Sequence, residues 1–195
     1  MIFKILTMKK FVLVLLALSV SLMSFAQDKE QENKSESKTL EFMSKGGSLI
    51  KKEFFDIGSV KGVKCQVLII TDLLSDTKMG CLRLETRYSG SSYSSSQTYI
   101  GTLDYDEIGD CIASIDYIRE NIITSTPPTY TETTYKTRDN IEVGTYYSEK
   151  SGKWMAYVYT KNYTSRSAEF FDSSSLLSLS TLMTTAKNMI TEKIQ

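Results

Sequence analysis

The chain has 195 residues, of which 23 are basic and 23 acidic, and it contains no histidine. The absence of histidine excludes Ser-His-Asp and Cys-His catalysis and removes the commonest metal ligand of proteins. The length suits one domain or one duplicated domain with a sizeable core, and the balanced charge lacks the broad positive field that usually drives nucleic-acid binding.

The first 26 residues predict a bacterial signal peptide. Three lysines precede the apolar stretch 11–20, and the small residues Ser24 and Ala26 stand before Gln27, where a signal peptidase would cleave. The apolar stretch is shorter than the roughly 20 residues that a membrane span needs. We therefore expect a protein that is not membrane-embedded and is exported, periplasmic or extracellular, after cleavage near Ala26–Gln27.

The segment that follows the cleavage site, residues 27–38, contains no apolar side chain. Such a segment cannot offset the entropy of ordering, so we expect a flexible spacer. Without residues 1–26 the net charge becomes −3, because three of the 23 basic residues lie there.

Residues 39–195 predict a single duplicated domain. Its first half shows runs of β-branched and alternating residues, for example Leu82 and Leu84 between Arg83 and Glu85. These runs predict four strands, at residues 49–57, 63–72, 78–88 and 98–103.

A helix follows the fourth strand. Asp104 is placed as its N-cap, and Glu107, three residues later, completes an acidic capping box. The helix is expected to end near Asn121. Its apolar stripe at helical spacing consists of Ile108, Cys111, Ile112, Ile115 and Ile118.

The second half repeats this order after residues 124–129, a linker that holds both prolines of the chain. Four further strands are predicted at residues 130–138, 141–149, 153–161 and 167–171. Asp172 is then placed as the N-cap of a second helix, whose apolar stripe is Leu176, Leu179, Met183, Ala186 and Ile190.

The two helices match without a gap when the first is shifted by 68 residues, which carries Asp104 onto Asp172 and Cys111 onto Leu179. We interpret the chain as two tandem ββββα repeats, at about 49–123 and about 130–192. The expected fold class is α+β, with two antiparallel four-stranded sheets, each followed by one helix. A chance match of two amphipathic helices is the alternative.

Two ββββα units in tandem, over about residues 49–192, resemble the whirly fold of plant Whirly proteins and Pur-type repeats. The resemblance is one of topology. It implies two four-stranded sheets that pack together and are braced by the helices. Several members of those families bind single-stranded nucleic acid, so the resemblance implies this function as an alternative for the chain.

Three cysteines, Cys65, Cys81 and Cys111, make an odd number for an oxidising compartment. Their neighbours are apolar, which favours buried thiols, while one disulfide between two of them stays open. The acids Asp104, Asp106, Glu107 and Asp110 could serve glycosidase chemistry or bind calcium, but capping of a helix explains them without either. We expect no cofactor and no metal.

Candidate binding residues lie on strand 153–161. Trp154, Ala156 and Val158 share the face expected to meet the core, and the opposite face with its neighbours supplies the candidates Tyr146, Met155, Tyr157, Tyr159 and Lys161. Exposed aromatic residues of this kind contact proteins, sugar rings or bases. The alternative is that this face is buried against the other repeat or a second subunit.

These observations predict an exported, non-enzymatic binding or protein-interaction module of unknown ligand. Its expected partner is an unknown protein or a glycan, nucleic acid is disfavoured, and a homo-oligomer stays open. The alternative is a single-stranded nucleic-acid-binding protein of whirly or Pur type.

Overall fold

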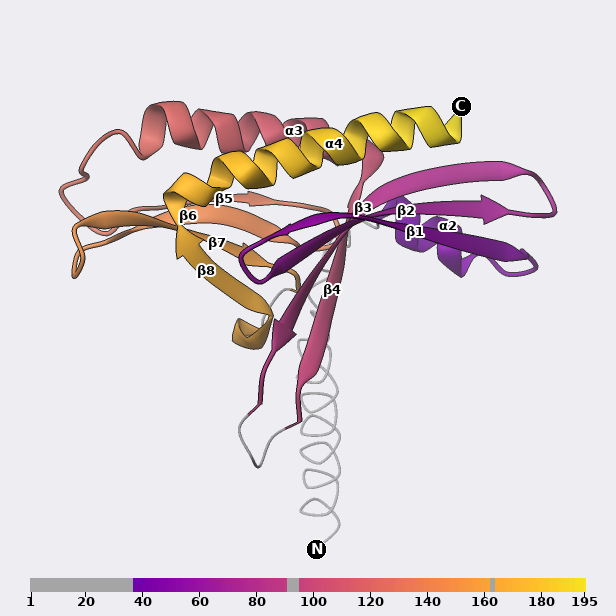
Figure 1. Ribbon diagram of the computed structural model, residues 1–195, viewed down its shortest axis with the longest axis horizontal. Helices are drawn as coiled ribbons and strands as arrows, with labels where there is room; N and C mark the ends of the chain where they lie inside the picture. The colour runs from indigo at the N-terminus through magenta and orange to yellow at the C-terminus, as the bar shows by residue number, and fades with distance from the viewer. Residues whose placement is uncertain (1–36, 91–94, 162–163) are drawn as a thin grey trace, which may run out of the picture. The chain divides into compact units, whose positions relative to one another are not determined.

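The computed structural model describes residues 37–90, 95–161 and 164–195, which belong to one compact unit spanning residues 35–195. The predicted signal peptide and residues 27–36 of the predicted spacer lie outside the described residues. Two four-stranded antiparallel sheets dominate the unit, and each is followed by a helix (Figure 1). The predicted fold class is therefore confirmed.

The first sheet has the strand order β1-β2-β3-β4 and leads into helix α3 (Tyr105–Tyr117). Its strands are β1 (Ile50–Val60), β2 (Val63–Asp72), β3 (Thr77–Tyr88) and β4 (Gln97–Asp104). The second sheet has the order β5-β6-β7-β8 and leads into helix α4 (Leu176–Ile194). Its strands are β5 (Glu132–Lys136), β6 (Glu142–Ser148), β7 (Lys153–Tyr159) and β8 (Ala168–Asp172).

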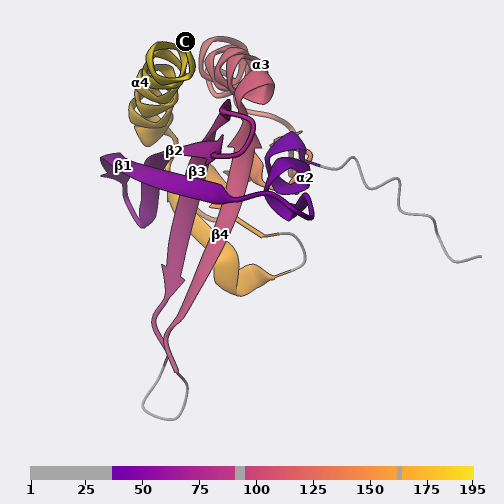
Figure 2. The same cartoon turned by 90° about the vertical axis from the view of Figure 1, so that its right-hand side faces the viewer.

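Helices α3 and α4 lie side by side and contribute their apolar stripes to one core (Figures 1 and 2). The inner faces of both sheets supply the rest of that core, for example Leu82 and Leu84 from β3 and Val158 from β7. Every predicted stripe residue is buried except Ile112, which is partly buried. The periodicity of the two helices therefore predicted the core correctly.

All three cysteines are buried free thiols. Burial raises the pKa of Cys65, Cys81 and Cys111 to about 12, which keeps them protonated and unreactive. The preference for buried thiols over a disulfide is confirmed.

The structure contains a short helix that the sequence did not predict, α2 (Lys38–Ser44). It begins inside the predicted spacer, where Ser37 caps it by accepting a hydrogen bond from the backbone of Leu40. Phe42 and Met43 of α2 then cover the outer face of the first sheet, over Leu68, Ile70 and Cys81. Ser37 and Lys38, which the sequence placed in the flexible spacer, are thus part of the fold. Their hydrogen bonds to a partner residue in a distant part of the chain hold them there.

That partner is Asp104, the predicted N-cap of α3, which is 2 % exposed. Its carboxylate accepts hydrogen bonds from the Ser37 hydroxyl (2.9 Å) and the backbone N–H groups of Lys38 (2.8 Å) and Thr39 (3.0 Å). Burial by itself would raise the pKa of Asp104, but these hydrogen bonds outweigh it and leave the pKa below its ordinary value. One carboxylate therefore fixes the start of α2 as well as α3.

Arg138, in the turn between β5 and β6, binds the same cluster of acids. Its guanidinium lies 3.0 Å from Asp104, contacts Asp106, and approaches Glu107 at 3.5 Å. Glu107 also completes the predicted capping box. The acids at the start of α3 thus join the first repeat to the second sheet, and their arrangement is a structural one.

Two boundaries differ from prediction by about one turn or three residues: the end of β1 and the start of α4. Strand β1 continues to Val60 through a bulge at Asp56–Gly58, where Gly58 has a φ of 130° that favours glycine. The helical segment that begins with α3 ends at Ile122, close to the expected Asn121, and its last turn, η1 (Ile118–Ile122), is π-helical. Asp172 caps η3 (Ser173–Ser175), a 3₁₀ turn, through the backbone N–H of Ser174 (2.9 Å), so α4 begins one turn later than expected.

In the segments that the structure describes, no helix combines the length and the apolar character that crossing a membrane requires.

Candidate binding face on the second sheet

Strand β7 orients the candidate residues. Ala156 and Val158 point into the core, and Trp154 is buried, with its indole N–H donating to the carbonyl of Ser125 at 2.7 Å. Because successive side chains of a strand alternate, Met155, Tyr157 and Tyr159 occupy the opposite, outer face.

The strand register aligns three rows of side chains across that outer face. They are Glu132–Tyr146–Met155–Asp172, Thr134–Gly144–Tyr157–Phe170 and Lys136–Glu142–Tyr159–Ala168. Tyr130, which precedes β5, adds a further ring beside Tyr146, with a centroid distance of 6.4 Å. We call the five rings the aromatic face; they are Tyr130, Tyr146, Tyr157, Tyr159 and Phe170.

Tyr157 is the centre of the aromatic face, yet it is only 2 % exposed. Its ring lies over Gly144, where a Cβ atom would stand 2.7 Å from the ring carbon that carries the hydroxyl. That hydroxyl donates to Glu132 at 2.6 Å and lies 2.5 Å from the Thr134 hydroxyl. Burial, and then the hydrogen bond to the Glu132 carboxylate, raise the pKa of Tyr157. Tyr157 therefore supports the other rings and offers little surface to a ligand.

The exposed area belongs to the rings around Tyr157. Tyr130 is 58 % and Phe170 52 % exposed, and Tyr146 and Tyr159 are partly exposed. Phe170 stands nearly perpendicular to both Tyr146 and Tyr159, at 84° and 6.0 Å in each case. Edge-to-face packing holds the rings in place but leaves no flat, coplanar platform.

The other two candidate residues lie at the margins. Met155 is partly exposed and is paired across the sheet with Tyr146. Lys161 is exposed and follows the end of β7. The structure thus brings together Tyr146, Tyr157 and Tyr159.

Sequence reasoning missed Tyr130 and Phe170, the two most exposed rings of the aromatic face. Phe170 had a usable signal, because it alternates with the buried Phe171 along β8. Tyr130 had a weaker signal: it begins the predicted strand 130–138, but β5 starts only at Glu132, so no register pairs Tyr130 across the sheet.

Two carboxylates, Glu132 and Glu142, lie on the outer face of the second sheet among the rings of the aromatic face. Glu132 accepts hydrogen bonds from the hydroxyls of Tyr130 (2.9 Å) and Tyr157 (2.6 Å). No lysine or arginine of the described segments forms an ion pair with Glu132, whereas Glu142 has Lys136 at 3.4 Å. Desolvation and then Glu132 raise the pKa of Tyr130 and Tyr159, so the tyrosines stay neutral hydrogen-bond donors at physiological pH.

The two sheets differ in what covers their outer faces. Helix α2 packs on the outer face of the first sheet. Within residues 37–90, 95–161 and 164–195, no helix covers the aromatic face of the second. The same segments contain no cluster of three or more acidic or cysteine residues arranged to hold a metal ion.

Comparison with protein-family models, with curated proteins and with solved structures found no match for this chain.

Proposed function

We propose that the chain is an exported, non-enzymatic protein-interaction module that contacts its partner through the aromatic face. The observation that carries this proposal is the pair of half-exposed rings, Tyr130 and Phe170, held on a packed aromatic base. Tyrosine and other aromatic residues are enriched at protein interfaces, where rigid rings lose little conformational entropy on binding.

The geometry favours a protein over a glycan. A sugar ring stacks on a flat aromatic surface, but Phe170 stands edge-on to its neighbours. A protein surface can supply side chains that fit between tilted rings. The aromatic face is therefore better matched to the side chains of a protein surface than to a flat sugar ring.

The charge of the aromatic face specifies the chemistry of that partner. Glu132 is an exposed carboxylate held by two tyrosine hydroxyls, and the Tyr130 and Tyr146 rings lie beside it. A lysine or arginine of the partner would pair with Glu132 and place its charge near the π-systems, a cation–π contact worth about 0.5–2 kcal/mol. We infer that the partner presents a basic side chain here.

Single-stranded nucleic-acid binding of whirly or Pur type is the second candidate. The two sheet–helix units in tandem support it. Stacking on the rings would contribute about 1–3 kcal/mol per base. Glu132 and Glu142, which lie among the rings, would repel phosphates, and association itself costs an estimated 4–15 kcal/mol. We therefore expect binding to mixed-sequence single-stranded DNA to be weaker than roughly 10 µM at physiological salt.

The test uses residues 27–195 and an array of random nine-residue peptides. We expect the bound peptides to contain lysine or arginine. We also expect Phe170→Ala to lower the affinity for these peptides by about tenfold or more, the effect typical of a residue central to an interface. Phe54→Ala is the matched control, because Phe54 is equally exposed, at 52 %, on the first sheet.

Two results would reject the protein-interaction proposal. One is an equal effect of Phe170→Ala and Phe54→Ala on every bound peptide. The other is sub-micromolar affinity for single-stranded DNA in a fluorescence-anisotropy titration, weakened by Phe170→Ala, which would favour the second candidate instead.

A further inference from the structure

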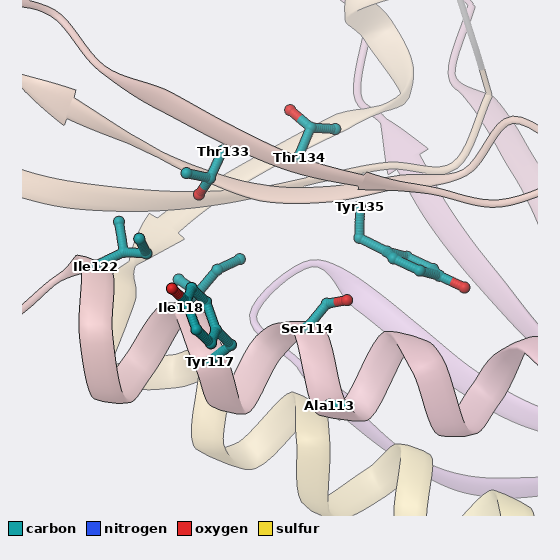
Figure 3. Close-up of a pocket in the computed structure, with 8 residues that line it drawn as sticks. All are labelled: Ala113, Ser114, Tyr117, Ile118, Ile122, Thr133, Thr134 and Tyr135. Atoms are coloured by element: carbon teal, nitrogen blue, oxygen red, sulfur yellow. The ribbon is translucent and has the colours of Figure 1, made fainter.

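A groove of about 360 Å³ runs between strand β5 and the helical segment formed by α3 and η1 (Figure 3). The helical wall includes Ala113, Tyr117, Ile118 and Ile122, and the strand wall is residues 133–135. In Figure 3, Thr133 is directed toward the helix and Thr134 away from it. Tyr117, at the mouth, is 62 % exposed. The groove is thus apolar, open to solvent and bordered by a strand.

Among the strands that the structure describes, β5 pairs with β6 alone and is therefore an edge strand. The backbone of Tyr147 donates to Thr131, and that of Thr137 donates to Ile141, each at 2.9 Å. In an antiparallel pair the hydrogen-bonded residues alternate, so Thr133 and Tyr135 also use their backbone groups for β6. Glu132 and Thr134 consequently direct their backbone N–H and C=O groups toward the free edge beside the groove.

The helical wall has an unusual local conformation at the same place. The N–H of Ile123 donates to the carbonyl of Ile118 at 3.0 Å, five residues earlier, which defines the π-helical turn η1. Such turns are rare and occur frequently at functional sites. Here the turn lies at the groove, and both Ile118 and Ile122 line the cavity.

We propose that this groove receives an extended peptide segment of the partner, which adds to β5 as a fifth strand of the second sheet. Its backbone would pair with Thr134 and Glu132, and its inward side chains, which are aliphatic, would contact Ile118 and Ile122. Its outward side chain opposite Glu132 is basic, because cross-strand neighbours of opposite charge stabilise a sheet. This inference rests on the proposed function, since it names how a protein partner with a basic side chain docks.

Thr134→Pro is the sharpest variant, because proline removes one N–H at the free edge and leaves the bonds to β6 intact. Thr134→Val is its control: it also loses the hydroxyl beside Tyr157 but keeps the N–H. Peptides are selected from a phage-displayed library of random nine-residue sequences on residues 27–195 and then titrated as synthetic peptides. We expect Thr134→Pro to lower the affinity for the selected peptides at least tenfold and Thr134→Val to lower it less than threefold.

A second variant keeps the test informative if Thr134→Pro does not fold. Ala113→Trp fills the groove from an exposed helical position and should also weaken the peptides at least tenfold. Ser178→Trp, on the exposed side of α4, is its control and should leave affinity unchanged. Hydrogen exchange should show the Thr134 amide becoming protected when peptide binds.

The outcomes separate this inference from the proposed function. If Phe170→Ala weakens the peptides but Thr134→Pro and Ala113→Trp do not, the aromatic face binds and strand addition is wrong. If the reverse holds, strand addition stands and the aromatic face is not the contact. A library that yields no binding peptide overturns the inference. A dimer in sedimentation experiments that Thr134→Pro converts to a monomer also overturns the inference. In that case β5 pairs with a second copy of this chain and not with a peptide of another protein.

Discussion

Arg138→Met removes the cation that joins the second sheet to the start of α3 while keeping the aliphatic part of the side chain. Asp104, 2 % exposed, then loses an ion pair of 3.0 Å, and Asp106 and Glu107 lose the same partner. Breaking a buried ion pair by removing one partner typically costs about 3–5 kcal/mol, because the remaining charge is buried without compensation.

The expected loss is smaller here for two reasons. Asp104 keeps its three hydrogen bonds from residues 37–39, and the Arg138 side chain is 23 % exposed, so water screens part of the interaction. We therefore expect Arg138→Met to lower the free energy of unfolding by about 2–3 kcal/mol. For a domain of this size, that loss corresponds to a fall in Tm of roughly 4–12 °C.

Urea denaturation followed by circular dichroism measures this loss. Arg119→Met is the matched control, because Arg119 of η1 pairs with Asp116 of α3 at 3.0 Å in a more exposed ion pair. Exposed pairs contribute about 0–1 kcal/mol, so the control should change stability little. The reasoning fails if Arg138→Met is no more destabilising than Arg119→Met.

Three further predictions concern pH, packing and export. Arg138 and Lys38 lower the pKa of Asp106 to about 2, so the unfolded chain takes up a proton at higher pH than the folded protein does, and stability should fall as pH decreases from about 4 toward 2. Asp106→Asn should reduce this fall when the free energy of unfolding is measured against pH. An unchanged slope would contradict the prediction. Cys111→Ala should lower the free energy of unfolding, measured by urea denaturation, by about 1–2 kcal/mol. Rapid reaction of Cys111 with a thiol reagent in the folded protein would show that it is not a core residue. Intact-mass measurement of the secreted protein should find Gln27 at its N-terminus, whereas an intracellular form that retains Met1 would contradict the signal-peptide hypothesis.

Local patterns were sufficient to predict most of the architecture. Strand β2 occupies the residues expected from its β-branched run, and the capping box of Asp104 and Glu107 marks the start of α3. The stripe of α4, from Leu176 to Ile190, is buried throughout. These features follow from neighbours within one helical turn or a few strand residues, which a single sequence displays directly.

The helix α2 and the π-helical turn η1 could not be predicted in this way. Helix α2 is stabilised by Asp104, which is 67 positions from the Ser37 hydroxyl that donates to it. Nothing in the polar composition around Ser37 reveals that contact. The turn η1 continues the apolar periodicity of α3 and differs from it only in its backbone hydrogen bond.

The candidate site shows the same division between local pattern and long-range contact. The alternation along β7 placed Tyr157 and Tyr159 on the outer face, because strand geometry fixes the direction of each side chain. Only the register with β6 decided that Tyr157 would lie over Gly144 and become buried. Only β8 and the approach to β5 added Phe170 and Tyr130 as the exposed rings. The sequence by itself therefore determined which face each residue occupies, and the tertiary structure decided which of these residues remain accessible, since accessibility depends on strands that are distant along the chain.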